Sequence, residues 1–157
     1  MAPPLRWIDI GSGAGFPGLA AALVLDDRRR ANEVHLLESN QKKAAFLREA
    51  VRATKSGSIV RAQRVEEAGE TVAAGRERCF DVITARACAP LTRLLGYAHP
   101  LWQQDKSVGV FLKGREAEAE LTDAAKSWRF RFELKPSRSD PDGRIVVIKR
   151  LEHVPGV

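Results

Sequence analysis

The chain has 157 residues, of which 26 are Lys or Arg and 20 are Asp or Glu, so its formal net charge is +6 at pH 7. Its length suits one globular domain, and we expect residues 1–157 to form a single domain. A hydrophobic content of 44% with 29% charged residues excludes a disordered tail, a collagen-like fibre and a coiled coil.

The first half of the chain alternates short apolar runs with helical patterns. A strand is predicted over Leu5–Ile10, and the glycine-rich loop Gly11–Gly18 follows it. A helix is predicted from Pro17 to Leu25, because proline in the first turn sacrifices no helical hydrogen bond. The next predicted elements are a strand over Glu33–Leu37 and a helix that is capped by Ser39 or Asn40 and ends near Ala53.

This last helix is amphipathic in the sequence. Its basic positions are predicted to point outward, and its apolar residues are predicted to form one stripe that covers the sheet. The outward set is Lys42, Lys43, Arg48 and Arg52, and the stripe is Phe46, Leu47, Ala50 and Val51.

The second half continues the alternation and then changes character. The predicted elements are strands over Ser58–Ala62, Phe80–Ala85 and Val108–Lys113, with helices over Glu66–Ala74, after Pro90 and over Glu116–Lys126. From Trp128 to Lys135 apolar and charged residues alternate strictly, as in a strand with one buried face. A turn over Pro136–Gly143 and a strand over Arg144–Lys149 complete a hairpin.

Five strand–helix units followed by an antiparallel hairpin predict an α/β fold with a mostly parallel seven-stranded sheet. This is the layout of the Rossmann-like fold of methyltransferases that depend on S-adenosylmethionine (SAM). A dinucleotide dehydrogenase would have six parallel strands instead.

The glycine loop lies where the first strand turns into the first helix, which is where ligands bind in open α/β sheets. Gly13, Gly15 and Gly18 match the dinucleotide fingerprint, so the motif alone leaves both a dinucleotide and SAM open. Asp9 favours SAM, because a carboxylate repels a diphosphate and attracts the ammonium and sulfonium groups of SAM. Glu38 is placed to bind ribose hydroxyls of either cofactor. We expect Asp9, Gly11, Gly13 and Glu38 to bind SAM.

Five segments stand out as recognisable motifs, namely the loop Asp9–Leu19, the run Leu36–Leu47, Arg64–Glu67, Thr84–Ala87 and Phe111–Gly114. Together they closely resemble the glucose-inhibited division protein B family. Members of that family methylate N7 of one guanosine in the 16S ribosomal RNA of the small (30S) subunit. The resemblance extends from Trp7 to Lys149, and it implies SAM as the cofactor and 16S rRNA as the partner.

The resemblance also implies roles for individual residues. Gly11 and Phe16 line the SAM pocket, and Val65 with Glu66 contacts the adenine. Arg86 lies beside the cofactor and the target base, and we expect it to be catalytic. Lys113 is the second expected catalytic residue, in contact with RNA phosphate or the guanine, although a salt bridge is the alternative for both cations.

Methyl transfer to N7 of guanine needs alignment more than a general base, because N7 already offers a lone pair in the plane of the ring. The sequence also lacks the motifs of two other classes of nucleic-acid methyltransferase. The segment after the fourth strand has no Asn/Asp-Pro-Pro-Tyr/Phe motif for adenine N6 methylation. Cys88-Ala89-Pro90 has the wrong order for the nucleophile of a cytosine C5 enzyme.

Eight basic and three acidic residues between 126 and 150 make the predicted hairpin the most basic region. We expect it to bind rRNA phosphates, with Arg129 and Arg131 as candidates. The alternative for such charge is simple solubility.

Several further expectations come from composition. The two cysteines, Cys79 and Cys88, form no CxxC pair, and we expect both to be small buried residues. The three histidines show no ligand spacing, so no metal site is expected. No apolar run is long enough to span a bilayer, and we expect a cytoplasmic monomer.

Members of the resembled family usually carry several dozen mainly helical residues before the first strand, and this chain starts with Met-Ala-Pro-Pro. We therefore expect a cofactor-binding core without that segment. Two alternatives stay open, namely a non-catalytic fragment that binds SAM or RNA, and an NAD-type oxidoreductase.

Overall fold

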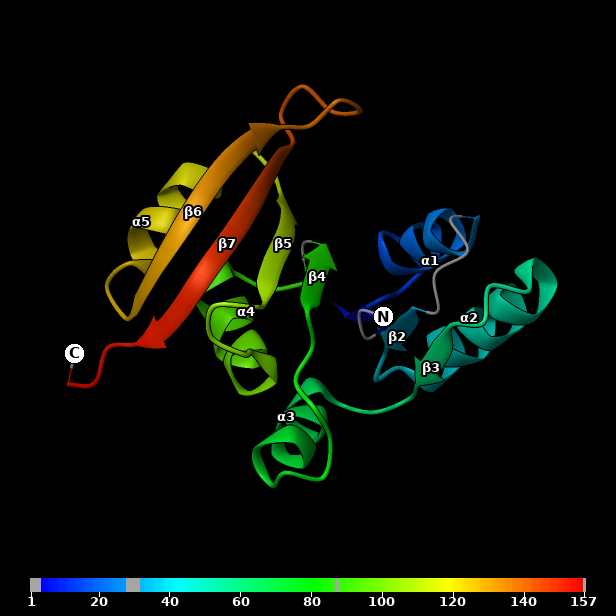
Figure 1. Ribbon diagram of the computed structural model, residues 1–157. Helices are drawn as coiled ribbons and strands as arrows, with labels where there is room; N and C mark the ends of the chain where they lie inside the picture. The colour runs from blue at the N-terminus through cyan, green and yellow to red at the C-terminus, as the bar shows by residue number, and fades with distance from the viewer. Residues whose placement is uncertain (1–3, 28–31, 87, 157) are drawn as a thin grey trace.

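The computed structural model describes residues 4–27, 32–86 and 88–156. Across these residues, seven strands form one sheet in the order β3-β2-β1-β4-β5-β7-β6 (Figure 1). Strands β1 to β5 run parallel, and β7 is antiparallel to both β5 and β6. The bounds are β1 Arg6–Ile10, β2 Glu33–Leu37, β3 Ile59–Arg61, β4 Val82–Arg86, β5 Val108–Lys113, β6 Trp128–Pro136 and β7 Arg144–His153. The predicted Rossmann-like methyltransferase fold with its C-terminal hairpin is confirmed.

Helices cover both faces of the sheet. On one face α1 and α2 pack around Leu19, Leu36 and Leu47. On the other face α3, α4 and α5 enclose a larger core that includes Ile83, Leu94 and Phe111. The bounds are α1 Gly18–Asp27, α2 Gln41–Thr54, α3 Val65–Ala73, α4 Leu91–Ala98, a short 3₁₀ helix His99–Leu101 and α5 Ala117–Ala124. No helix of the described residues is both long and apolar enough to cross a membrane.

Three predicted features differ from the structure because tertiary contacts decide them. Phe80 precedes the fourth strand and makes only an isolated bridge to Trp102, so β4 begins at Val82. Strand β7 continues to His153 through a bulge at Arg150, which has a φ of 55°. Phe132 lies on the apolar side of β6 but remains 52% exposed, because β6 is the edge strand and α5 covers it incompletely.

The strand order reverses direction between β1 and β4. Beyond this point β2 and β3 extend to one side, and β5, β7 and β6 extend to the other. The carboxyl ends of β1 and β4 meet there, since Ile10 pairs with Ala85. In open α/β sheets the crevice at such a switch point is where ligands bind.

Ion pairs around the buried Arg6 stabilise the start of β1. The Arg6 guanidinium lies 2.8 Å from Glu33 and 2.8 Å from Glu77, and it stacks over the Phe80 ring at 4.4 Å. Arg61 forms a second ion pair with Glu77 at 2.9 Å. These contacts join the starts of β1 and β2, the end of β3 and the segment before β4.

Candidate functional site

The Asp9 carboxylate organises the glycine loop from below. It is 1% exposed, and its Oδ1 accepts a 2.6 Å hydrogen bond from the Thr84 hydroxyl on β4. Its Oδ2 accepts hydrogen bonds from the Ser12 hydroxyl at 2.7 Å and from the Gly18 backbone N–H at 3.1 Å. One side chain therefore ties the end of β1 to β4, to the start of the loop and to the start of α1.

Burial raises the pKa of the Asp9 carboxyl above its ordinary value, and the hydrogen bonds from Thr84, Ser12 and Gly18 oppose that rise. Both oxygens already have partners within the protein. Direct contact between Asp9 and a cofactor stays a prediction. What the geometry adds is a structural role, in which Asp9 sets the shape of the loop.

This role predicts a specific sensitivity at Gly18. A Cβ added at Gly18 would lie 2.6 Å from the Asp9 Cβ and 2.6 Å from Leu36 Cδ2, and both neighbours are buried. Gly18→Ala is therefore expected to lower the free energy of unfolding by about 1–3 kcal/mol, as overpacking does. Urea unfolding measures the loss. Gly114→Ala is the control, because nothing lies within 4 Å of the added carbon; equal stability of the two variants would contradict the Asp9 anchor.

A pocket of about 160 Å³ opens at the carboxyl ends of β1, β2 and β3. Four predicted cofactor residues, Gly11, Glu38, Val65 and Glu66, line it together. Gly11 adopts a φ of 66°, which turns the backbone of the loop toward the pocket. Glu38 is only 8% exposed, and Val65 and Glu66 open helix α3. The sequence prediction thus grouped residues from three separate segments that the fold does bring together.

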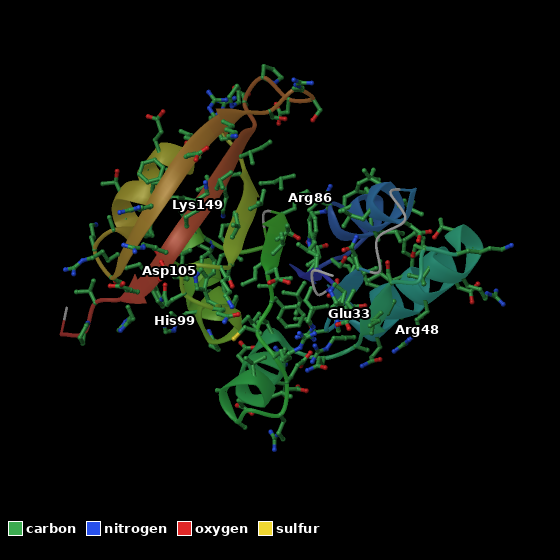
Figure 2. All side chains as sticks on the ribbon, in the orientation of Figure 1. Glu33, Arg48, Arg86, His99, Asp105 and Lys149 are labelled. Carbon is green, nitrogen blue, oxygen red and sulfur yellow. The ribbon has the colours of Figure 1, made fainter. Side chains whose placement is uncertain are left out.

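A larger cleft of about 830 Å³ adjoins this pocket and shares Gly11, Glu38 and Cys88 with it. Gly13 and Arg86 also line this cleft. Arg86 is exposed and ends β4, in the space between α1 and the hairpin half of the sheet (Figure 2). Arg86 therefore borders the cleft that adjoins the pocket, and its contact with the cofactor and the target base stays a prediction.

On the other side of Arg86 lies a third cleft, of about 780 Å³, between the glycine loop and the turn that joins β6 to β7. Phe16 and Lys113 line it, and Phe16 does not line the 160 Å³ pocket. The Phe16 side chain is 57% exposed. The contact between Phe16 and SAM stays a prediction, because Phe16 is not among the residues that line the 160 Å³ pocket.

Lys113 is buried and already has partners, which its sequence position did not reveal. Its Nζ donates to the Ala89 carbonyl at 2.6 Å and lies 2.8 Å from Glu120 Oε2 on α5. The same Glu120 oxygen accepts the Leu91 N–H at 2.7 Å, at the start of α4. Lys113 and Glu120 together fix the segment that follows Arg86. A contact between Lys113 and RNA stays a prediction, and an ammonium group has one further N–H to offer.

The Lys113–Glu120 pair carries a stability prediction. Glu120→Ala leaves a buried ammonium group with one acceptor and removes the partner of the Leu91 N–H. The expected loss is about 2–3 kcal/mol, less than for a fully buried pair, because the Glu120 side chain is 26% exposed. Glu120→Gln keeps an acceptor oxygen and is expected to lose less. Urea unfolding of both variants measures the difference, and unchanged stability of Glu120→Ala would show that the pair contributes nothing.

Among the residues that line these clefts without having been predicted as site residues, one is a cysteine and two are aromatic. Cys88 was expected to be buried, but it is exposed and lines both the pocket and the larger cleft. Tyr97 reaches the pocket from α4. Phe46 was expected in the apolar stripe of α2, but it is 55% exposed and lines the larger cleft. An aromatic at the edge of a helical stripe was the one signal in the sequence, and it is a weak one.

The basic residues of the hairpin divide between the two ends of the sheet. Arg131 lies level with Lys149 and so with Val108, at the start of β5, whereas Arg86 pairs with Leu112. Four residues of strand separate these levels, which is about 13 Å. Arg129 lies further still from Arg86 along β6. Binding of rRNA by Arg129 and Arg131 stays a prediction, and these residues do not border the clefts described above.

Within the described ranges, no group of three or more His, Cys, Asp and Glu side chains is arranged to hold a metal ion.

Comparison with known proteins identifies the family. Residues 2–138 match the family model GidB, described as rRNA small subunit methyltransferase G. Relatives called ribosomal RNA small subunit methyltransferase G include one from Parvibaculum lavamentivorans, 44% identical over 93% of this chain and 62% of its own length. Another, from Granulibacter bethesdensis, is 46% identical over 94% of this chain and 63% of its own length.

Among solved structures, an O-methyltransferase from Bacillus cereus in complex with SAH superposes with a TM-score of 0.67. The two chains are 14% identical, and the match covers 92% of this chain and 74% of that one. At this identity the likeness shows the fold alone. The chain spans somewhat less than two thirds of the length of the two relatives above. The family match covers most of the sequence, and this chain belongs to the rRNA small subunit methyltransferase G family.

Proposed function

We propose that this chain transfers the methyl group of SAM to N7 of a guanosine in 16S rRNA. The observation that carries the proposal is one pocket that joins Gly11, Glu38, Val65 and Glu66, with Arg86 on the adjoining cleft. Membership of the family supports ribosomal RNA as the substrate. The choice of N7 rests on the resemblance of the sequence motifs and is the finer part of the proposal.

The residues of the pocket fit SAM. An added Cβ at Gly11 would lie 3.2 Å from the Cys88 Cβ, so the space above the loop is open only because the residue is glycine. Glu38 Oε2 accepts only a long, 3.4 Å hydrogen bond from the Asn40 N–H, which leaves the carboxylate able to accept ribose hydroxyls. Carboxylates at Glu38 and Glu66 attract a cationic cofactor and disfavour a diphosphate.

When bound, SAM supplies a methyl carbon that accepts the lone pair of guanine N7 while the carbon–sulfur bond breaks. N7 carries no proton, so the reaction needs no general base, and the buried Lys113 is not required as one. The protein's task is alignment of the two reactants. Arg86 lies where the two larger clefts meet, and its guanidinium is placed to hold the target nucleotide against the cofactor pocket.

The two rival functions are weighed by different observations. An NAD-type oxidoreductase is disfavoured by the strand order, because β7 runs antiparallel next to β5 where a dehydrogenase has a parallel strand. A non-catalytic fragment is the second candidate, since the chain matches 62% and 63% of the length of the two relatives described above.

Two measurements separate these functions. Calorimetric titration with SAM, its demethylated product and NAD tests the cofactor, and binding of NAD without any response to SAM would overturn the proposal. Transfer of label from methyl-labelled SAM to 30S subunits that lack the modification tests catalysis. Fully modified 30S subunits are the control and are expected to take up no label.

A further inference from the structure

The first turns of α2 carry an exposed surface beside the larger cleft. Lys42, Lys43 and Phe46 are all exposed, and all three line the 830 Å³ cleft together with Arg86. Their spacing of three and four residues places them on one face of the helix. Leu47 and Ala44 are the buried residues of α2, and Phe46 lies about 100° around the helix from Leu47. We call this face the α2 patch.

The charge of the α2 patch does not serve the helix. Lys42 and Lys43 lie in the first turn of α2, where the helix dipole favours acidic residues, and no acidic residue is present there. Among the residues that the structure describes, neither lysine forms an ion pair. Residues 41–55 contain five basic residues and one acidic residue, a net charge of +4. The patch is therefore an unneutralised cationic surface beside the site.

The hairpin charges are more strongly neutralised. Glu133 accepts contacts from Lys149 at 3.3 Å and from Lys135 at 3.6 Å. Arg150 pairs with Asp105 at 3.0 Å. The basic hairpin residues level with the start of β5 also lie away from Arg86. Position and charge favour α2 over the hairpin residues level with the start of β5, whereas Arg138 and Arg144 at the β6–β7 turn line the cleft on the other side of Arg86.

The exposed ring of Phe46 selects the kind of polyanion. Among the described residues, few large apolar side chains are as exposed as Phe46, at 55%, and Phe46 lines the same cleft as Arg86, Lys42 and Lys43. Aromatic rings flanked by cations bind single-stranded nucleic acid, because unpaired bases stack on the ring and phosphates contact the cations.

We propose that the α2 patch binds a single-stranded segment of the RNA substrate next to the target nucleotide, with an unpaired base on Phe46 and phosphates at Lys42 and Lys43. This inference rests on the proposed function and adds to it the surface that holds the RNA. The RNA strand then approaches Arg86 along α2.

The test is steady-state methyl transfer to under-modified 30S subunits by the double variant Lys42→Glu/Lys43→Glu and by Phe46→Ala. Acidic residues suit the first turn of a helix, so the double variant is expected to fold. The double variant loses two phosphate contacts. Its plot of the log binding constant for 30S subunits against log salt concentration is therefore expected to be shallower by about 1.4. Loss of one stacked base is expected to raise the KM for 30S subunits about tenfold in Phe46→Ala. In both variants kcat and SAM affinity are expected to stay close to those of the wild type.

Matched controls come from the same chain. Arg48→Glu reverses a charge on another side of α2, where Arg48 projects outward (Figure 2). Phe132→Ala removes an aromatic ring of similar exposure, 52%, on the edge strand β6. Arg129→Glu/Arg131→Glu reverses two charges at the far end of the sheet. Arg48→Glu and Phe132→Ala are expected to keep the wild-type KM, and Arg129→Glu/Arg131→Glu measures the separate contribution predicted for the hairpin.

The outcomes separate the two proposals. If the wild type transfers no methyl group, the proposed function fails. If the wild type is active and the α2 variants keep its KM and salt slope, the α2 patch is wrong while the function stands. If KM rises only with Arg129→Glu/Arg131→Glu, the hairpin binds the RNA and the α2 patch does not. A change in sedimentation of the α2 variants without a change in KM would indicate that the patch binds a second copy of the chain, and would likewise overturn the inference.

Discussion

Arg86→Ala is expected to reduce methyl transfer to 30S subunits about 100-fold, which corresponds to ~2.7 kcal/mol of transition-state stabilisation. The physical reason is position, because Arg86 ends β4 at the switch point and borders the clefts on both of its sides. Since its side chain is exposed and outside the core, the fold is expected to stay intact. Single-turnover transfer of labelled methyl groups measures the effect.

Two further variants, Arg86→Lys and Arg48→Ala, test whether the effect is specific to the Arg86 guanidinium. Arg86→Lys keeps the charge but loses the planar guanidinium, so it is expected to restore only part of the activity if that fork holds the target nucleotide. Arg48→Ala removes another exposed arginine and is expected to leave the rate unchanged. Wild-type rates in Arg86→Ala would remove Arg86 from the site.

Gly11→Val is the second change with a large expected effect. Gly11 has a φ of 66°, and a Cβ there would approach Cys88 Cβ to 3.2 Å and Cys88 Sγ to 3.5 Å. A valine would occupy the space over the loop that the pocket needs. SAM affinity is expected to fall about 100-fold, or ~2.7 kcal/mol, in a calorimetric titration.

A control is needed because valine at a positive φ also strains the backbone, and this strain alone could lower SAM affinity. Gly57 provides the control, because its φ of 67° matches that of Gly11 and an added Cβ meets nothing within 4 Å. Gly57→Val carries the same strain of a branched residue at positive φ, away from the pocket. Its SAM affinity is expected to equal that of the wild type once both proteins are folded. A normal titration with Gly11→Val would refute the assignment of the glycine loop to the cofactor.

Local patterns in the sequence were enough for most of the fold. Glu33–Leu37 and Val108–Lys113 have the predicted bounds, because short apolar runs bounded by polar segments are a direct signal of buried parallel strands. Asn40 caps α2 through a 3.0 Å hydrogen bond from the Lys43 N–H, as one of the two predicted caps. The order of strands and helices then restricts the topology to few arrangements.

The remaining features depend on contacts between distant segments. Helical periodicity placed Phe46 in the apolar stripe, but the covered part of α2 is narrower and leaves that ring at the cleft. Nothing in the sequence around Lys113 shows that Glu120 and Ala89 occupy its ammonium group. Asp9 was interpreted through its charge, whereas three hydrogen bonds from separate segments determine its surroundings.

The structure also shows where the basic residues behind the net charge of +6 lie relative to the site. The hairpin contains many basic residues, but several are paired with acids of their own hairpin or with Asp105. The lysines of α2 contribute fewer charges, and they lie beside Arg86. Location relative to the site, more than the number of cations, decides which surface is expected to hold RNA.

Mapping of the modified nucleotide decides whether this chain transfers a methyl group to N7 of a guanosine in small-subunit rRNA. Under-modified 30S subunits are incubated with this chain and methyl-labelled SAM, and the rRNA is then cleaved chemically at N7-methylguanosine. One labelled guanosine is expected, with its strand cleaved at that position, and labelling is expected to be about 100-fold slower with Arg86→Ala. Label at another base or atom, or SAM binding without any transfer, would contradict the proposed function.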